Sequence, residues 1–323
     1  MTAPAPAPDL LRVEGLSKSF YATRAAQDVS FAVGTGEVVS LLGENGAGKS
    51  TVIKMLAGVY RPDAGRVLLR GTDLDAGGTR KRISFVHQNL GLVDWMTVAE
   101  NIAQVLGYPR RAGFISQRGV RAQAERVLDA VGGGIDPETR IVDLPRTERS
   151  LLAIARGLVS DPLLLVLDEP TASLPAADVE RLFTVLRRLR DRGVGMLYVS
   201  HRLDEIYQIS SRTVVMRNGV VVADRPVAGL PPAELVQLIV GSETQLPAFD
   251  APADDVRLEL AGVRAGGAGP VDLSVRRGEV LALCGLRGAG QEAVGRAVAG
   301  AVPSDGAMTI DGAATDRGAP VTP

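Results

Sequence analysis

The chain has 323 residues, enough for two domains at about 100–200 residues each. Its 36 basic and 37 acidic side chains give a net charge of -1, which excludes the strongly basic class of proteins that bind nucleic-acid backbones, and we expect no nucleic-acid partner. A single cysteine excludes an internal disulfide, and no apolar run reaches the roughly 20 residues that a membrane-spanning helix needs.

Residues 1–8 (MTAPAPAP) lack the basic start and the apolar run of a secretory signal, and we expect a disordered or extended tail there. Short, partly alternating segments at 10–16, 25–33 and 37–43 predict three β-strands, with a glycine turn before the third. A Gly-rich loop follows, and the pattern from Lys49 to Leu56 predicts a helix.

Strands are predicted again at 66–71 and 82–89, and mainly helical structure over 97–107 and 118–160. Two uniformly apolar segments, Leu163–Leu167 and Gly195–Ser200, predict strands that are buried on both faces of a parallel sheet. The helix between them is indicated by apolar side chains at helical spacing, which are Val179, Leu182, Phe183, Leu186 and Leu189. Because strands alternate with helices, we expect an α/β fold with a doubly wound core.

A second copy of the N-terminal pattern begins after a Pro- and acid-containing linker at 243–254. Residues 256–290 repeat the pattern of residues 11–48, with a matching Gly-Glu-Val in each copy. We therefore expect a first domain at 9–242 and an incomplete second domain at 255–323. We expect the chain to be a fragment of a longer tandem protein, and a natural short form is the alternative.

The segment Gly43–Ser50 reads G-E-N-G-A-G-K-S and matches the P-loop pattern. In such a loop, backbone N–H groups and the N-terminus of the next helix surround phosphate oxygens. We expect Lys49 to reach the β- and γ-phosphates of a nucleotide and Ser50 to supply a hydroxyl ligand to Mg²⁺. A Gly-rich turn that matches by chance is the alternative, but the predicted strand before it and helix after it favour a P-loop.

An acidic pair, Asp168 and Glu169, follows the buried strand at Leu163–Leu167. This position is the carboxyl edge of the sheet, where α/β proteins bind ligands. We expect Asp168 to hold Mg²⁺ through water and Glu169 to act as general base or to position the attacking water. A helix-capping pair is the alternative.

The two histidines differ in their context. His201 follows the second buried strand, so it could sense a γ-phosphate, although a surface or satisfied core histidine is the alternative. His87 has no such support and is interpreted as structural. Gln88 closes the strand Ile83–His87 and precedes a loop, where a glutamine could bind Mg²⁺ or water, and the sequence leaves its role open.

In this order, these segments resemble the ATPase subunits of ABC transporters over residues 10–323. The resemblance implies a P-loop NTPase (RecA-like) core with an antiparallel β subdomain and a helical subdomain, and ATP and Mg²⁺ as cofactors. It implies that Phe20 stacks on adenine, that Gln88 faces a membrane subunit and that Thr171–Leu174 form the D-loop. The residues then expected to bind ATP are Phe20, Gly43, Glu44, Asn45, Gly46, Ala47, Gly48, Lys49, Ser50, Thr51 and Gln88; those expected at Mg²⁺ are Ser50, Gln88 and Asp168; those expected in catalysis are Glu169 and His201.

Three features are similar to the tandem ATPases of monosaccharide importers of the ribose/galactose/xylose type. They are the opening GLSKSF…QDVSF, the two copies in one chain and the altered second P-loop at Gly285–Glu292. We therefore expect an ATPase that energises import of a sugar or similar small solute, peripheral at the cytoplasmic face of the cell membrane. The implied partners are transmembrane permease subunits, a second ATPase half in cis or as a dimer and, indirectly, a solute-binding protein.

The chain departs from the family pattern at two places. Leu144–Glu148 aligns with the signature segment but has Pro145, which carries no hydroxyl, and Thr147 in place of a glycine. Gln291 and Glu292 replace the lysine and serine of the second P-loop. We expect one degraded and one live composite site, and we expect the chain alone to bind Mg-ATP but to hydrolyse it slowly.

Other functions remain as alternatives. The poor signature segment favours a nucleotide-binding remnant or regulatory module with little ATPase activity. A soluble ABC factor of the translation type should have two good P-loops and a long charged linker, neither of which is present. Exporter motors are disfavoured by the asymmetry of the two copies.

Overall fold

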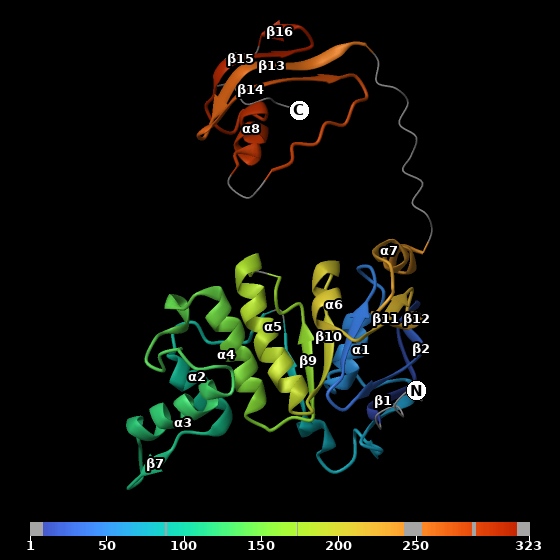
Figure 1. Ribbon diagram of the computed structural model, residues 1–323, viewed down its shortest axis with the longest axis vertical. Coiled ribbons are helices and arrows are strands. Elements are labelled where there is room, and N and C mark those ends of the chain that lie inside the picture. The colour runs from blue at the N-terminus through green and yellow to red at the C-terminus, as the bar shows by residue number, and fades with distance from the viewer. Residues whose placement is uncertain (1–8, 88, 173, 242–253, 286–288, 315–323) are drawn as a thin grey trace. The chain divides into compact units, whose positions relative to one another are not determined.

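The computed structural model describes residues 9–87, 89–172, 174–241, 254–285 and 289–314 (Figure 1). The chain divides into two compact units, Met1–Glu243 and Thr244–Pro323. The tail expected at 1–8, nearly all of the expected linker, and Gln88 lie outside the described residues.

The first unit begins with an antiparallel sheet in which partly alternating strands bury one face. Its strand order is β2 (Thr23–Gly34), β1 (Asp9–Phe20), β4 (Ala64–Leu69) and β5 (Thr72–Asp73). The first two strands follow the predicted segments and are joined by a short turn at Tyr21 and Ala22. This sheet is the expected antiparallel β subdomain.

A six-stranded sheet forms the centre of the first unit. Its order is β12 (Val220–Pro226), β11 (Arg212–Arg217), β3 (Val38–Leu42), β10 (Gly195–Val199), β9 (Leu164–Asp168) and β6 (Ile83–Val86). The five strands from β11 to β6 run parallel, and β12 pairs antiparallel at the edge. The parallel strands β3, β9 and β10 are covered on both faces, which is why their sequences are uniformly apolar rather than alternating.

Seven α-helices lie around this sheet among the described residues of the first unit. They are α1 (Lys49–Leu56), α2 (Val98–Leu106), α3 (Gln117–Asp129), α4 (Arg146–Leu158), α5 (Ala176–Asp191), α6 (Leu203–Ile209) and α7 (Pro232–Val240). Two short 3₁₀ turns, η1 (Thr79–Arg82) and η2 (Ile141–Asp143), precede β6 and α4. Figure 1 shows α2 and α3 together at the far side of the unit from β1 and β2, as the expected helical subdomain.

Alternate side chains of the central strands enter two different apolar clusters. Leu165 and Tyr198 pack with α2–α7 on one face, whereas Val166 and Leu197 pack with α1 and the antiparallel sheet on the other. The period-two alternation of a strand places these neighbours on opposite faces. The result is a three-layered α/β unit, as the sequence predicted.

The mainly helical structure expected over 118–160 is present as two helices, α3 and α4, with a long break between them. The chain leaves α3 after Asp129 and is not helical again, apart from η2, until Arg146. Three consecutive glycines at 132–134 have positive φ, and Pro137 and Pro145 cannot continue a helix from the preceding turn. The sequence patterns also missed a small hairpin, β7 (Arg110–Arg111) and β8 (Phe114–Ile115), between α2 and α3.

The second unit repeats the start of the first. Its sheet has the order β14 (Ala268–Arg276), β13 (Val256–Ala265), β15 (Asp305–Ile310) and β16 (Ala313–Ala314), with antiparallel pairs throughout. This matches β2-β1-β4-β5, and α8 (Gln291–Val298) has eight residues like α1. Residues 279–285, which align with the region of β3, are not in a strand, and Val280 is exposed.

Candidate functional site

The P-loop connects β3 to α1, as the sequence predicted. Gly48 is the N-cap of α1 and has a left-handed conformation with φ 104°. The first turn of α1 contains no acidic side chain, so its partial positive charge is uncancelled locally. This terminus is suited to an anion such as a phosphate group.

Two neighbouring segments hold the P-loop in place. The N–H of Gly219, in the turn between β11 and β12, donates to the carbonyl of Ala47 at 3.1 Å. The same turn accepts a bond from the N–H of Gln27 on β2 at 2.7 Å. A Cβ atom at Gly48 would lie 2.3 Å from the carbonyl oxygen of Ala25, so only glycine fits this close approach.

The ammonium group of Lys49 lies within the loop. Its Nζ donates to the carbonyl oxygens of Gly43 at 2.6 Å and Glu44 at 2.9 Å. Burial lowers the pKa of Lys49, and the negative charges of Glu169 and Asp168 oppose this effect. An incoming phosphate would supply the same kind of opposing charge at shorter range, so the site favours an anionic ligand.

Asp168 and Glu169 lie at the carboxyl end of β9, beside the P-loop. Burial, followed by the charge of Glu169, raises the pKa of Asp168, while Lys49 and His87 act in the opposite direction. The Glu169 N–H donates to the carbonyl of Val199 at 2.9 Å, and its backbone has a left-handed φ of 51°. The strands β9 and β10 therefore fix the backbone position from which the Glu169 side chain extends.

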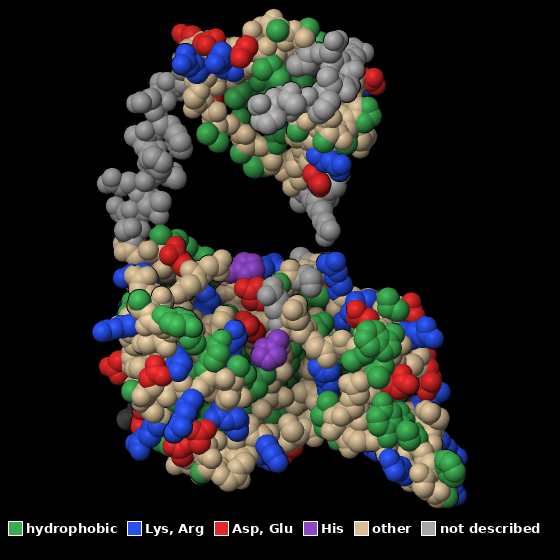
Figure 2. All heavy atoms as spheres, turned by 180° about the vertical axis from the view of Figure 1, so that it is seen from behind, with side chains coloured by type: hydrophobic (Ala, Val, Ile, Leu, Met, Phe, Trp, Pro, Cys, Tyr) green, Lys and Arg blue, Asp and Glu red, His purple; other side chains and the backbone are tan. Residues whose placement is uncertain are grey.

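His201 and Glu169 are in contact. His201 Nδ1 lies 3.1 Å from Glu169 Oε1, and the histidine side chain is 68% exposed whereas that of Glu169 is 27% exposed. Which ring nitrogen carries the proton depends on the tautomer. Figure 2 shows both histidines of the chain on one face of the first unit, with acidic side chains between them.

A cavity of about 550 Å³ runs along the P-loop. Its lining includes the following described residues: Thr23, Arg24, Ala25, Asn45, Gly46, Ala47, Gly48, Lys49, Ser50, Thr51, Asp168, Glu169, Val199 and Asn218. Gly43, Glu44 and His201 line an adjoining cavity of about 510 Å³. The structure thus brings most of the expected residues together around one loop.

The donors in this cavity fit a magnesium ion that is held mainly by a nucleotide. Ser50 and Asp168 provide a hydroxyl and a carboxylate oxygen, the hard ligands that Mg²⁺ prefers. The described part of the chain holds no cluster of three or more His, Cys, Asp or Glu side chains that could bind a metal unaided. This suits Mg²⁺, which proteins usually bind through one or two carboxylates together with substrate phosphates.

The roles expected for three further residues remain predictions. Phe20, expected against adenine, is not part of the cavity lining and packs edge-on against Tyr60, with ring centres 5.0 Å apart. Gln88, expected at Mg²⁺ and at the partner surface, lies outside the described residues. His87, interpreted as structural, contributes to the electrostatic field at Asp168.

The sequence missed Arg24 and Asn218, which line the cavity from outside the P-loop. Arg24 is at the start of β2, and Asn218 is in the turn between β11 and β12. Neither belongs to a recognisable local motif. Only the packing of both segments against the loop reveals them.

The segment aligned with the family signature forms the start of α4. Pro145 is the N-cap and makes no side-chain capping bond, and the side chain of Thr147 is buried. The carboxylate of Glu148 lies in the first turn. The loop before it is held by Arg149, which donates to the carbonyls of Leu144 and Val142. This helix start therefore presents no serine hydroxyl to a ligand.

The helix after the second P-loop begins with the same backbone conformation as the helix after the first. Gly290 is the N-cap of α8, with φ 98° and ψ -1°, close to φ 104° and ψ -4° at Gly48. Gln291 Nε2 donates to the carbonyl of Gly285 at 3.2 Å, in the position that Lys49 Nζ takes on Gly43. The amide reproduces the internal bond without the charge, because a neutral donor replaces an ammonium.

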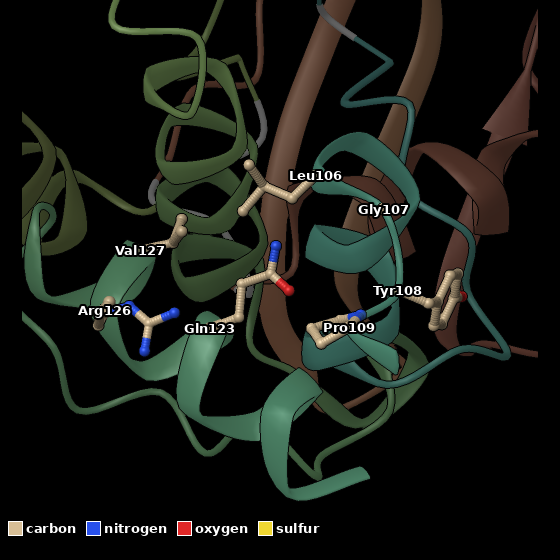
Figure 3. Close-up of a pocket in the computed structure, with 7 residues that line it drawn as sticks. All are labelled: Leu106, Gly107, Tyr108, Pro109, Gln123, Arg126 and Val127. Atoms are coloured by element: carbon tan, nitrogen blue, oxygen red, sulfur yellow. The ribbon is translucent and has the colours of Figure 1, made fainter. Parts of the chain in front are cut away.

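A further cavity of about 480 Å³ lies between α2 and α3 (Figure 3). It is lined by Leu106, Gly107, Tyr108, Pro109, Gln123, Arg126 and Val127. It has no carboxylate, histidine or hydroxyl nucleophile apart from the tyrosine. We therefore do not assign catalysis to it.

In the described residues there is no helix long and apolar enough to span a membrane.

Comparisons with known proteins identify relatives of this chain. Residues 26–172 match the family model described as ABC transporter. The ribose import ATP-binding protein RbsA 2 of Streptomyces coelicolor is 43% identical over 318 residues, which cover 96% of this chain and 61% of that protein. A putative ribose/galactose/methyl galactoside import ATP-binding protein of Agrobacterium fabrum is 37% identical over 99% of this chain and 65% of its own length. The chain thus spans less than two thirds of these relatives.

Solved structures show the same fold. The ADP conformation of MJ1267, an ATP-binding cassette of an ABC transporter, superimposes with a TM-score of 0.62 at 25% identity, over 72% of this chain and 99% of that one. The ATP-binding cassette MJ0796, bound to ADP and Pi, has a TM-score of 0.58 at 22% identity and shows the fold alone. Residues 26–172 therefore belong to the ABC transporter family, and the first unit that contains them has the fold of its ATP-binding cassettes.

Proposed function

We propose that this chain binds and hydrolyses ATP to energise the import of ribose or a similar small sugar. The observation that carries the proposal is the convergence of Lys49, Asp168, Glu169 and His201 on the P-loop. The relatives named above are sugar import ATP-binding proteins, which supports the transport role. The chain covers only part of those relatives, so activity, solute and partners are all proposed here.

Each side chain has a distinct role in this proposal. The loop N–H groups, the start of α1 and Lys49 bind the phosphates, and Lys49 exchanges its bonds to Gly43 and Glu44 for phosphate oxygens. Ser50 directly and Asp168 through water would hold Mg²⁺, which would offset the negative charge of the phosphates. Phe20 and Gln88 remain proposed contacts to the base and to the metal.

Glu169 and His201 form the hydrolytic pair. The exposed imidazole orients the carboxylate through the contact at 3.1 Å, and the carboxylate positions the attacking water or accepts its proton. Phosphoryl transfer depends mainly on such positioning and on charge.

The partners proposed are those of an importer. They are transmembrane permease subunits, a second ATPase half in cis or as a dimer, and a solute-binding protein that acts indirectly. The chain would then work at the cytoplasmic face of the cell membrane as a peripheral subunit. Residues 255–323 would be the start of a second cassette, an assignment supported by the matching strand orders.

A second candidate is a nucleotide-binding module with little hydrolysis. The start of α4 favours it, because Pro145 and the buried Thr147 supply no hydroxyl to the γ-phosphate of a partner site. Gln291 favours it too, since the second P-loop lacks the ammonium group.

The test is ATP-analogue binding and phosphate release by the chain, beside Lys49→Ala and Glu169→Gln. Loss of one charge-assisted contact to phosphate should weaken binding about 10–100-fold in Lys49→Ala. Lys54→Ala is the matched control, because Lys54 is on the same helix as Lys49 but its ammonium lies over the ring of Tyr60, a residue beyond the end of that helix. Failure of the unaltered chain to bind ATP would refute the proposal.

Turnover separates the two candidates. Binding with turnover near background supports the nucleotide-binding module for the chain alone. Robust turnover that Glu169→Gln abolishes supports the complete enzyme. That result would also show that the start of α4 suffices as a signature segment.

A further inference from the structure

A fully buried carboxylate lies next to the hydrolytic pair. Glu205, on α6, is 0% exposed. Its Oε2 accepts hydrogen bonds from three hydroxyl groups, those of Thr171 at 2.7 Å, Tyr198 at 2.7 Å and Ser200 at 2.8 Å. Arg202 Nη1 lies 3.0 Å from Oε1 as an ion pair. The Glu205 side chain thus links three parts of the backbone, which are the segment after β9, the strand β10 itself and the segment after β10.

The surrounding groups fit an ionised carboxylate. Three O–H donors on one oxygen suit an acceptor-only group, and the guanidinium of Arg202 balances its charge. Burial, together with the nearby charge of Glu205, raises the pKa of Tyr198, so that phenol stays protonated and remains a donor. Ser200 also accepts a bond from the Arg202 N–H at 3.1 Å, which extends the network.

The network joins the two segments that carry the hydrolytic pair. Thr171 is two residues after Glu169, and Ser200 is directly before His201. Glu169 and His201 meet at 3.1 Å, while the residues beside them share the Glu205 carboxylate. The paired register of β9 and β10 ends at Asp168 and Val199, with the Glu169 N–H still donating to the Val199 carbonyl, so the sheet sets where these segments start and side-chain contacts act beyond that point.

Stability alone is a weak explanation for this carboxylate. A buried charge loses its hydration, and well-packed apolar side chains often replace buried ion pairs without loss of stability. The position of Glu205 at the end of the sheet that holds the hydrolytic pair is better explained by alignment. Fixed hydrogen bonds hold reacting groups within the narrow range that phosphoryl transfer requires.

We propose that Glu205 is a positioning residue for hydrolysis, whose carboxylate fixes the distance between Glu169 and His201. The inference rests on the proposed ATPase function but concerns a residue outside the P-loop and the acidic pair. Glu205→Gln keeps the shape of the side chain and removes its charge. One amide oxygen cannot match the carboxylate as acceptor for three hydroxyls and partner of Arg202, so both segments should shift.

The test compares Glu205→Gln, in the 323-residue chain, with two further variants. Thr171→Val removes only the hydroxyl on the Glu169 side, and it remains informative if Glu205→Gln does not fold. Glu37→Gln is the matched control, because Glu37 is also a hydrogen-bonded carboxylate, paired with Arg212, but lies before β3 at the opposite end of the sheet. Each variant is measured for affinity for an ATP analogue, for single-turnover phosphate release and for its imidazole NMR signals.

The chain has two histidines, so His87 serves as an internal reference for His201. We expect Glu205→Gln and Thr171→Val to move the His201 signals more than those of His87. Glu205→Gln should slow phosphate release at least about 10-fold while the affinity changes less than about 3-fold, because the P-loop contacts are untouched. Glu37→Gln should leave His201 and the rate unchanged.

Three results would overturn the proposal. They are unchanged His201 signals in both site variants, an equal response in Glu37→Gln, or a loss of affinity that parallels the loss of rate. Absence of ATP binding by the unaltered chain would overturn the ATPase function alone. The His201 signals are recorded without nucleotide, so they still decide whether Glu205 sets the geometry.

Discussion

Replacing Gly48 by alanine tests whether the P-loop depends on its close approach to β2. Gly46 is the matched control, because its φ is also positive, 85° compared with 104° at Gly48. A Cβ atom at Gly46 would meet nothing within 4 Å. An alanine in the left-handed region costs about 1–2 kcal/mol at either position. At Gly48 the Cβ would also lie 2.3 Å from the carbonyl oxygen of Ala25, and relief of this overlap costs about 1–3 kcal/mol more.

The two variants should therefore differ in free energy of unfolding by about 1–3 kcal/mol. Urea unfolding followed by far-UV circular dichroism measures this difference. Affinity for an ATP analogue should fall at least about 10-fold further in Gly48→Ala, because the start of α1 must move to relieve the overlap. Equal losses in both variants would refute the reasoning, since the φ penalty alone would then explain the effect.

Three other substitutions test separate features. Leu197→Ala removes a fully buried side chain and should lower the free energy of unfolding by about 2–5 kcal/mol in urea titrations. Burial raises the pKa of Asp168 above its usual 3.8, so the folded state favours the protonated acid and loses stability as pH rises through that pKa. Asp168→Asn should thus raise the urea midpoint at pH 7, with a gain that shrinks towards pH 4, and no gain at pH 7 would contradict it. Phe20→Ala should weaken binding of ATP and GTP alike about 10-fold if the ring stacks on the base, and unchanged affinity would leave Phe20 a partner of Tyr60 only.

Local sequence patterns were enough to predict those parts of the protein whose conformation depends on residues that are neighbours along the chain. Glycines at fixed offsets encode the P-loop backbone, and the apolar run of β9 followed by Asp168 encodes a buried strand that ends in an acid. Both were predicted within a residue or two because conformation and burial there follow from short-range chemistry. The pattern over 118–160 predicted mainly helical structure but did not mark the break between α3 and α4, where glycines and prolines interrupt the helix.

The tertiary structure alone decided which side chains meet at the end of the sheet. The strand order places β10 beside β9, and only this brings His201 onto Glu169. Glu205 and Thr171 are 34 positions apart, yet they share a hydrogen bond in the interior. Likewise, no local signal indicated that Arg24 lines the cavity. Spacing along the chain fixes φ, ψ and the buried face of one element, whereas contacts between elements depend on how the whole core packs.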